Sequence, residues 1–590
     1  MDFKQKAEEK KMSMSKNIAR LAVTAGLTAA LSFGGVMAPV TMAFAADGDN
    51  TITINQVDKN ATTSFKAYQI FKADVVDPTE AEATDKIVSN VKWAFDNPDI
   101  QHAIIDAINS CFQSNVLNYN ASPQDVADWL AANVKNTTKE TLVDKDSVLN
   151  KIANVVKDKV KPTGNSFNAG TAFEPKSADD TPNTGYYLFL TDDASIGQLT
   201  ENKKNTGTSP IFAVVGGHPV TVTEKTSIPT VNKEVREGAT WGKASDSYIG
   251  EEVEYKLTGS VASNIATFNK YEYVFQDTLS KGLEVAKNDD DTPKDLRVCI
   301  VDSKTNTEKE VKLDAANGYQ VTVTPDTTSG TELFKVSFAN LKAVQDASGN
   351  RISVNADSTV VITYKAKLNS QVEYKADGAT NEVKLVYSNN PMTNDKGTSE
   401  SDKVADYVFG LDVTKTDSVN PEKKLVAGFK VKMTKEGNRD VPDGGKWLTA
   451  DGGFTTDNNK AGEFTTREDD GKVFIPGLVE GTYEITESKT PAGYNTIDPF
   501  TITVKPTYNA AGTLTNLNVT SSSNMATATT GKNVNSTKIP VTIQNKKGSG
   551  LPLTGLNGVT FTWIAGGAVL CIGVAHLIRS RKQAEESEQE

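Results

Sequence analysis

Three polar side chains near the C-terminal end of the sequence each extend a row of apolar residues. Alternate residues of a β-strand point to the same face of a sheet. By this parity Lys415 shares a face with Leu411 and Val413. In the same way Glu487 shares a face with Tyr483 and Ile485, and Asn545 with Val541 and Ile543. We therefore expect a lysine, an acid and an asparagine to face one core.

The middle of the sequence repeats this order of residue types. Here Lys233 shares a face with Val231 and Val235. Asp277 shares a face with Tyr271, Tyr273 and Phe275, and Asn381 with Val383, Leu385 and Tyr387. Because the same order occurs twice, we infer that the three side chains take part in the same chemistry in both places.

Such a triplet is suited to joining two side chains covalently. Burial lowers the pKa of a lysine, and a neutral amine is a nucleophile toward a neighbouring carboxamide. A buried protonated carboxyl can polarise the amide carbonyl and shuttle protons. We therefore expect isopeptide bonds with loss of ammonia, Lys233–Asn381 and Lys415–Asn545. The alternative is a buried lysine–acid ion pair beside an unrelated asparagine, or strand ends where the polar groups reach water.

The composition argues against several other functions. The 590 residues carry a net charge of −12 at pH 7, whereas nucleic-acid binding needs a basic footprint. Only three histidines occur, His102, His218 and His576, which disfavours imidazole-based hydrolysis and multi-histidine metal sites. The run 288–291 lacks the spacing of a calcium loop, so a solvated loop is predicted. We predict a protein that is not an enzyme and needs no metal and no cofactor.

The N-terminal region has the features of an export signal. Basic residues precede an apolar stretch from Leu21 to Phe44, and Ala43-Phe44-Ala45 supplies a small-x-small cleavage pattern. Residues 1–45 are therefore predicted to be a signal peptide, the alternative being a retained membrane anchor. The exported region would hold only Cys111 and Cys299, in different predicted domains, so no internal disulfide is expected.

The C-terminal region, residues 551–590, combines three features in a fixed order. These are the motif Leu551-Pro552-Leu553-Thr554-Gly555, an apolar stretch over 558–578, and the basic residues Arg579, Arg581 and Lys582. The apolar stretch has the length of a membrane-spanning helix, and the basic residues would hold the tail in the cytoplasm. A plain transmembrane protein is the alternative.

The elements that must position these residues are mainly strands. Residues 46–225 are predicted to form a mixed β domain with inserted helices, because Ser122-Pro123 looks like a helix start and apolar residues recur at helical spacing from Val148 to Val160. Residues 226–390 and 406–547 read as immunoglobulin-like β-sandwiches, with a polar linker at 391–405. The predicted fold class is thus mainly β, with tandem sandwich domains.

Several of these residues also resemble a known family. The segment Tyr483-Glu-Ile-Thr-Glu487-Ser-Lys-Thr-Pro491-Ala-Gly493-Tyr494 resembles the E-box of Gram-positive pilins. Residues 406–547 look like a CnaB-type isopeptide domain and residues 226–390 like a CnaA-type domain. In those domains the acid, here Glu487 or Asp277, promotes the isopeptide bond.

The whole layout resembles the backbone, or major, subunit of a sortase-assembled pilus. The C-terminal region is similar to the LPXTG sorting signal, in which a sortase cysteine attacks the Thr554–Gly555 bond. The resemblance implies that a lysine of the next copy resolves the acyl-enzyme, and Lys225 is the candidate. Strand parity opposite Val220 and Val222 predicts that Lys225 is exposed, although the family motif usually ends Tyr-Pro-Lys and this one ends Thr-Glu-Lys.

The resemblance also implies partners and a location. The partners are a class C-type pilus sortase, a housekeeping sortase, other copies of the chain, accessory pilins, peptidoglycan and host surface ligands. The protein would be secreted, held at the membrane as a precursor and then anchored covalently to the cell wall. The alternative is a wall-anchored adhesin or accessory pilin that is not polymerised and does not use Lys225. A wall-anchored enzyme is weakest, because no nucleophile-elbow or zinc-protease motif occurs.

Overall fold

The computed structural model describes residues 50–57, 62–77, 86–134, 142–177, 179–196, 206–437, 441–442, 444–529 and 534–548. The predicted signal peptide and the predicted sorting region both lie outside the described residues. The described chain is mainly β, which confirms the predicted fold class. It divides into two compact units, and the second holds Asp246–Glu251, Glu373–Gly378 and the described residues from Tyr407 onward.

Among the residues described, two sheets and three helices form the N-terminal part of the first unit. The larger sheet has the order β3-β2-β6-β7, with β4 also on β2, and the smaller has the order β5-β1-β8. The strands are β1 (Ile52–Asn55), β2 (Ser64–Val76), β3 (Ile87–Trp93), β4 (Phe167–Asn168), β5 (Ala172–Phe173), β6 (Gly185–Thr191), β7 (Ile211–Val215) and β8 (Val220–Thr223).

Strand β6 is apolar along most of its length because both of its faces are covered. Tyr186, Leu188 and Leu190 pack in the core beneath the helices, whereas Tyr187 and Phe189 pack against β1 and β8. Every residue of β6 is buried. A continuous apolar strand is expected where neither face meets water.

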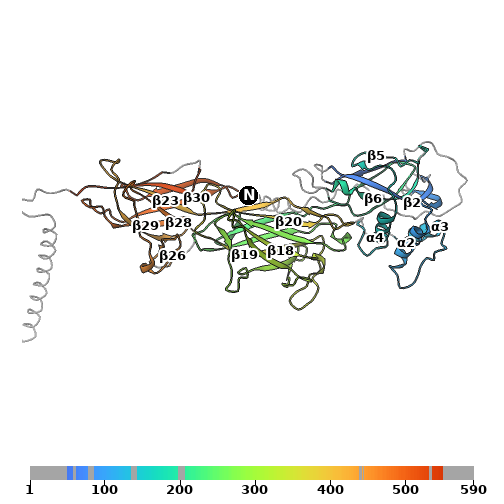
Figure 1. Cartoon of the computed structure of the whole chain (residues 1–590), viewed down its shortest axis with the longest axis horizontal. Coiled ribbons are helices and arrows are strands. Elements are labelled where there is room, and N and C mark those ends of the chain that lie inside the picture. The colour runs from blue at the N-terminus through green and yellow to red at the C-terminus, as the bar shows by residue number, and fades with distance from the viewer. Residues whose placement is uncertain are drawn as a thin grey trace, which may run out of the picture. The chain divides into compact units, whose positions relative to one another are not determined.

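The helices are α2 (Pro98–Asn109), α3 (Pro123–Asn133) and α4 (Val148–Lys159). Each begins after a side chain that caps it, which is Asn97, Ser122 or Ser147. The predicted start at Ser122 is confirmed, since Ser122 and Asp125 form a reciprocal capping box. Figure 1 shows the three helices gathered beside β2 and β6, with which their apolar faces share a core.

A two-sheet sandwich follows in the same unit. One sheet has the order β10-β9-β12-β19-β15-β16 with β14 on β19, and the other has the order β11-β22-β20-β13-β18-β17 with β21 on β20. The first sheet consists of β9 (Val231–Glu237), β10 (Thr240–Gly242), β12 (Glu252–Ser260), β14 (Leu283–Val285), β15 (Arg297–Asp302), β16 (Thr307–Glu310) and β19 (Ser358–Leu368). The second consists of β11 (Ala244–Asp246), β13 (Tyr273–Leu279), β17 (Gln320–Pro325), β18 (Glu332–Phe338), β20 (Ala379–Ser388), β21 (Lys396–Thr398) and β22 (Asp402–Tyr407).

The predicted linker at 391–405 is wrong. β21 and β22 lie in or overlap this segment, and both pair with β20. Asn390, just before it, is buried. Its polar composition is typical of a linker, but the backbone of β21 and β22 is paired in the sheet.

The second unit contains another two-sheet sandwich. One sheet has the order β28-β23-β33-β32, and the other has the order β26-β25-β24-β29-β30-β31 with β27 on β24. The first consists of β23 (Phe409–Asp417), β28 (Lys472–Leu478), β32 (Ala526–Ala528) and β33 (Lys538–Asn545). The second consists of β24 (Gly428–Lys435), β25 (Lys446–Leu448), β26 (Phe454–Thr455), β27 (Phe464–Thr465), β29 (Gly481–Lys489), β30 (Phe500–Tyr508) and β31 (Leu514–Ser521).

Four short 3₁₀ helices complete the described elements. They are η1 (Asp193–Ser195), η2 (Ile265–Thr267), η3 (Leu341–Ala343) and η4 (Asn458–Lys460). No helix among the described residues is long and apolar enough to cross a membrane. The predicted membrane stretch at 558–578 falls outside those residues.

Candidate functional site

The middle sandwich brings together the three residues of its predicted triplet. Lys233 comes from β9 in one sheet, whereas Asp277 on β13 and Asn381 on β20 come from the sheet that faces it. All three residues are 0% exposed. The predicted burial of this triplet is therefore confirmed.

A tyrosine that the sequence argument did not identify joins the three side chains. The Lys233 Nζ donates to Asp277 Oδ2 at 2.5 Å and lies 3.3 Å from the hydroxyl of Tyr364 on β19. That hydroxyl donates to Asp277 Oδ2 at 2.6 Å and accepts from Asn381 Nδ2 at 2.7 Å. Tyr364 sits in the apolar row of β19, where a tyrosine is an ordinary core residue, so its sequence context gives no signal.

Burial governs the electrostatics of this site. Desolvation lowers the pKa of Lys233 to about 8, and the neighbouring Asp277 carboxylate opposes that shift only in part. Desolvation also raises the pKa of Tyr364 well above 10, so its hydroxyl keeps its proton. The amine is therefore much closer to its neutral, nucleophilic form than a surface lysine is.

The backbone of Lys233 is held by a second ion pair nearer the surface. Asp402 Oδ2 accepts from the Lys233 backbone N–H at 2.6 Å, and the Lys243 Nζ donates to the Lys233 carbonyl at 2.6 Å. Lys243 and Asp402 are paired with each other at 2.5 Å. Both polar groups of the Lys233 backbone are thus satisfied by one ion pair, and this fixes where the side chain enters the core.

The C-terminal sandwich assembles its triplet in a different way. Lys415 on β23 and Asn545 on β33 come from neighbouring parallel strands of one sheet, in which Asp417 is paired with Asn545. Glu487 on β29 comes from the opposite sheet. Lys415 and Asn545 are 0% exposed and Glu487 is 5% exposed, which confirms the predicted burial.

The acid of this triplet contacts the asparagine directly. Asn545 Nδ2 donates to Glu487 Oε2 at 3.1 Å, and the Lys415 Nζ lies 3.0 Å from Glu487 Oε1. That ion-pair contact is not aligned as a hydrogen bond, and no other described residue accepts from the amine. Desolvation lowers the pKa of Lys415, as it does for Lys233.

The end of the E-box-like segment forms a turn that positions Asn545. Tyr494 N–H donates to the Pro491 carbonyl at 3.1 Å, and Gly493 has a φ of +81°, which favours glycine. The turn delivers the Asn495 carbonyl, which accepts from Asn545 Nδ2 at 2.8 Å. It also delivers the Tyr494 hydroxyl, which donates to Asp417 at 2.7 Å.

Lys225 lies just after β8, on a backbone that is held from two directions. Its N–H donates to Thr208 Oγ1 at 2.8 Å, and its carbonyl accepts from the Ser209 N–H at 2.9 Å and from Asn264 Nδ2 at 3.1 Å. Lys225 is half-buried, so the prediction that it is exposed is wrong. The strand ends at Thr223, and parity therefore no longer applies at 225. Desolvation lowers the pKa of the Lys225 amine.

Other polar features of the described residues do not form a comparable site. Lys66 pairs with Asp192 at 2.7 Å but is about one-third exposed. The loop 288–291 is exposed and paired with Lys287. Cys111 and Cys299 are free thiols. No group of three metal-ligating side chains that could hold an ion occurs in the described part of the chain.

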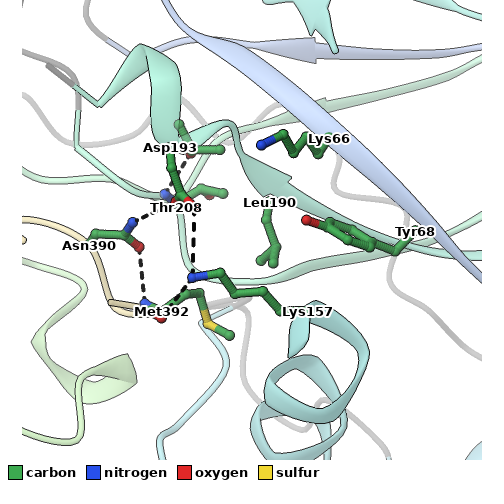
Figure 2. Close-up of a pocket in the computed structure, with 9 residues that line it drawn as sticks. Lys66, Tyr68, Lys157, Leu190, Asp193, Thr208, Asn390 and Met392 are labelled. Carbon is green, nitrogen blue, oxygen red and sulfur yellow. Dashed lines mark hydrogen bonds and ion pairs between the residues drawn. The ribbon is translucent and has the colours of Figure 1, made fainter. Parts of the chain in front are cut away.

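A small pocket lies where α4 and β6 meet the segment after β20 (Figure 2). Lys157 Nζ donates to the Met392 carbonyl at 2.9 Å, and Asn390 Nδ2 donates to Asp193 at 3.2 Å. The pocket has room for about one water molecule. We interpret it as a polar contact within the first unit and not as a binding site, because Lys157 is paired with Asp193 and Lys66 with Asp192.

Comparison with known families gives a match for one segment. Residues 409–520 match the family described as SpaA, a prealbumin-like fold domain. This segment resembles a prealbumin-like SpaA domain. It includes Lys415 and Glu487 and ends before Asn545. No curated protein matches the chain in sequence.

Several solved structures of pilins also match the chain. The T6 backbone pilin of serotype M6 Streptococcus pyogenes matches at 15% identity over 86% of this chain and 100% of that chain, with a TM-score of 0.48. The Corynebacterium diphtheriae major pilin SpaA matches at 13% identity over 84% and 99%, with a TM-score of 0.40. The group B streptococcus pilus 2b backbone protein matches at 22% identity over 55% and 99%, with a TM-score of 0.36.

Proposed function

We propose that this chain is the backbone subunit of a cell-surface pilus and that each sandwich is locked by an internal Lys–Asn isopeptide bond. The observation that carries the proposal is the presence of a buried lysine, acid and asparagine in both sandwiches. Taking a lysine and a carboxylate out of water is costly. In the C-terminal cluster the asparagine is hydrogen-bonded to the acid, and in the middle cluster it is hydrogen-bonded to Tyr364, which contacts the acid. Two such clusters are favourable only if the charges are later removed.

The proposed reaction removes those charges. A proton passes from the lysine to the acid, and the neutral Nζ attacks the asparagine Cγ. The Nζ–Cγ bond forms, the Cγ–Nδ2 bond breaks, and Nδ2 leaves as ammonia after gaining one proton. The product is a neutral amide beside a protonated carboxyl. In the C-terminal sandwich, Glu487 contacts Asn545 Nδ2 directly and can give the proton that the leaving nitrogen gains.

Polymerisation is proposed to join Thr554 of one copy to Lys225 of the next. The lowered pKa of Lys225 favours the neutral amine that must attack a thioester-like acyl-enzyme. The held backbone at 225 would present that amine in one place. Sortases, accessory pilins and peptidoglycan are the partners this function requires, with the mature protein outside the membrane and bound to the cell wall.

A wall-anchored adhesin or accessory pilin remains the second candidate. It would keep the LPLTG motif and both internal bonds, because these stiffen any protein under tension. It would have no use for Lys225. The two candidates therefore differ in a single measurable property, which is whether the chain forms covalent polymers through that lysine.

The test is an immunoblot of boiled, SDS-treated wall extracts from cells that express the wild type, Lys225→Ala or Lys159→Ala. Lys159 is an exposed lysine on α4 and serves as the matched control. We expect a high-mass ladder in the wild type and in Lys159→Ala, and only monomer in Lys225→Ala. A ladder in all three strains would move the linkage to another lysine. The absence of any ladder would favour the adhesin.

The internal bonds are tested on the same protein by intact mass. Each bond removes one ammonia, about 17 Da, so a recombinant chain spanning Ala46–Thr554 should be about 34 Da lighter than its sequence. Asn381→Ala and Asn545→Ala should each be only about 17 Da lighter than the mass of its own sequence, because one bond can no longer form. A wild-type mass equal to the sequence mass would eliminate both bonds.

A further inference from the structure

The hydroxyl of Tyr364 touches every member of the triad in the middle sandwich. It lies within hydrogen-bonding distance of the lysine amine, the aspartate oxygen and the asparagine nitrogen, at 3.3, 2.6 and 2.7 Å. The residue is 0% exposed. Its contact atom on Asn381 is Nδ2, the atom that must leave as ammonia if the proposed bond forms.

The two sandwiches differ at this position. In the C-terminal sandwich Glu487 reaches Asn545 Nδ2 itself, at 3.1 Å. In the middle sandwich the acid is an aspartate, which is one methylene shorter, and Asn381 is offset from it by two residues on the neighbouring strand, since Asp277 is paired with Val383. Among the described residues, Asn381 Nδ2 makes its hydrogen bond to Tyr364 and not to Asp277.

We propose that Tyr364 is a catalytic residue of the middle sandwich, carrying the proton from Asp277 to the departing nitrogen of Asn381. This inference rests on the proposed isopeptide reaction. In the C-terminal sandwich the longer side chain of Glu487 contacts the asparagine nitrogen directly. In the middle sandwich the Tyr364 hydroxyl links the shorter Asp277 to that nitrogen.

The proton balance of the step is complete within these four side chains. The reaction starts from the neutral Lys233 amine and protonated Asp277. After Nζ attacks Cγ, Asp277 gives its proton to the Tyr364 oxygen, and Tyr364 gives its own hydroxyl proton to Nδ2. The Cγ–Nδ2 bond breaks and ammonia leaves, while the excess proton on Nζ returns to Asp277. The high pKa of Tyr364 suits a hydroxyl that passes a proton on without being left ionised.

A neighbouring tyrosine provides a matched control. Tyr255 is paired with Tyr364 across β12 and β19, and the two rings stack with their centroids 5.6 Å apart. The Lys233 Nζ lies 5.5 Å from the Tyr255 ring and 5.6 Å from the Tyr364 ring. The Tyr255 hydroxyl is instead directed to Asp406, at 3.4 Å. Tyr255→Phe therefore removes a buried hydroxyl from a ring next to the same lysine, and it leaves the proposed proton relay unchanged.

The experiment measures bond formation during refolding of the chain spanning Ala46–Thr554. Unfolded chain is recovered in urea from inclusion bodies, its starting mass is checked against the sequence, and refolding is sampled by intact mass and by mapping of linked peptides. The Lys415–Asn545 bond of the same molecule reports refolding of the C-terminal sandwich, and near-UV circular dichroism against the wild type reports refolding of the tyrosine-rich middle sandwich. The variants are Tyr364→Phe, Tyr255→Phe and the double variant Asp277→Glu with Tyr364→Phe.

We expect Tyr364→Phe to form the Lys233–Asn381 bond at least about tenfold more slowly than the wild type, while the other bond forms normally. Tyr255→Phe should match the wild type. The double variant should recover the bond, because a glutamate can reach Nδ2 directly, and a purely structural role for the hydroxyl predicts no such rescue. Should Tyr364→Phe fail to fold, the double variant decides by the presence or absence of the bond.

Bond formation at the wild-type rate in Tyr364→Phe would overturn the relay. A wild-type chain that never loses about 17 Da from this sandwich would overturn the isopeptide proposal itself. The two failures are therefore distinguishable in one set of samples.

Discussion

At the scale of single residues, the two buried lysines are held in a state that ordinary stability would not favour. Lys233 lies against Asp277 and Lys415 against Glu487, with almost no solvent at either pair. A buried ion pair often contributes less than well-packed apolar residues of the same volume. The presence of such an ion pair in both sandwiches is explained if the pair is a reactant. The product amide is neutral, so no buried charge remains.

The pH dependence of bond formation follows from the number of protons on the pair. The reactive form, a neutral Lys233 and a protonated Asp277, contains as many protons as the ion pair, so its fraction does not change with pH while the pair keeps its proton. The folded-state pKa of Lys233 is lowered to about 8. Above that pH the pair loses the proton that the leaving nitrogen requires.

We therefore predict a rate of Lys233–Asn381 bond formation that is flat up to about pH 8 and then falls about tenfold per pH unit. The measurement is ammonia loss during refolding between pH 6 and pH 10, in an Asn545→Ala background so that the mass change reports this bond alone. A rate that rises through pH 8 would show that a free amine suffices and that the carboxyl proton is not needed.

At the scale of elements, strand parity predicted the burial of the six triplet residues. Lys233, Asp277 and Asn381 continue rows of apolar residues, and an interrupted row is visible in sequence alone. Parity cannot show which sheet a strand joins, so it did not reveal that Lys233 faces Asn381 across the core whereas Lys415 and Asn545 are on adjacent strands. Those relations depend on long-range pairing.

Other elements were missed for identifiable reasons. The helix α2 begins at Pro98, after the capping residue Asn97, and buries Ile104, Ile105 and Ile108. This pattern is visible in the sequence. Strands β21 and β22 could not be found in this way, because their polar sequence resembles a linker. They are ordered by long-range pairing, β21 with β20 and β22 with β20 and β11. Tyr364 is recognisable only once the two sheets face each other.

The turn after β29 gives a prediction at this scale. Gly493 has a φ of +81°, and a Cβ there would meet no atom within 4 Å, so Gly493→Ala costs about 1 kcal/mol of backbone strain without a clash. Because the turn holds the Asn495 carbonyl against Asn545, we expect the Lys415–Asn545 bond to form about fivefold more slowly. The rate is read from ammonia loss during refolding in an Asn381→Ala background.

Gly444→Ala is the control for that measurement. Gly444 lies in the same sandwich, has a φ of +91° and also faces open space. It should suffer similar strain while leaving the rate of bond formation unchanged. Equal slowing in both variants would mean that loss of stability, and not the position of Asn495, sets the rate.

At the scale of the whole molecule, the two proposed bonds would decide which parts of the chain carry tension. A pulling force enters the C-terminal sandwich at β23 and leaves at β33, which are parallel neighbours. A bond from Lys415 to Asn545 passes the force directly between these strands. Residues 416–544 are then removed from the load path, and a bond from Lys233 to Asn381 removes residues 234–380 in the same way.

Single-molecule pulling should measure these hidden lengths. The wild-type chain should extend without releasing either segment, because a covalent bond must break first. Asn545→Ala should release about 129 residues, or about 440 Å, and Asn381→Ala about 147 residues, or about 500 Å, at about 3.4 Å per residue. Asn518→Ala, an exposed asparagine on β31, should extend like the wild type. Release of both segments from the wild-type chain would show that neither sandwich is crosslinked, and the chain would then have to resist force through its hydrogen-bonded sheets alone.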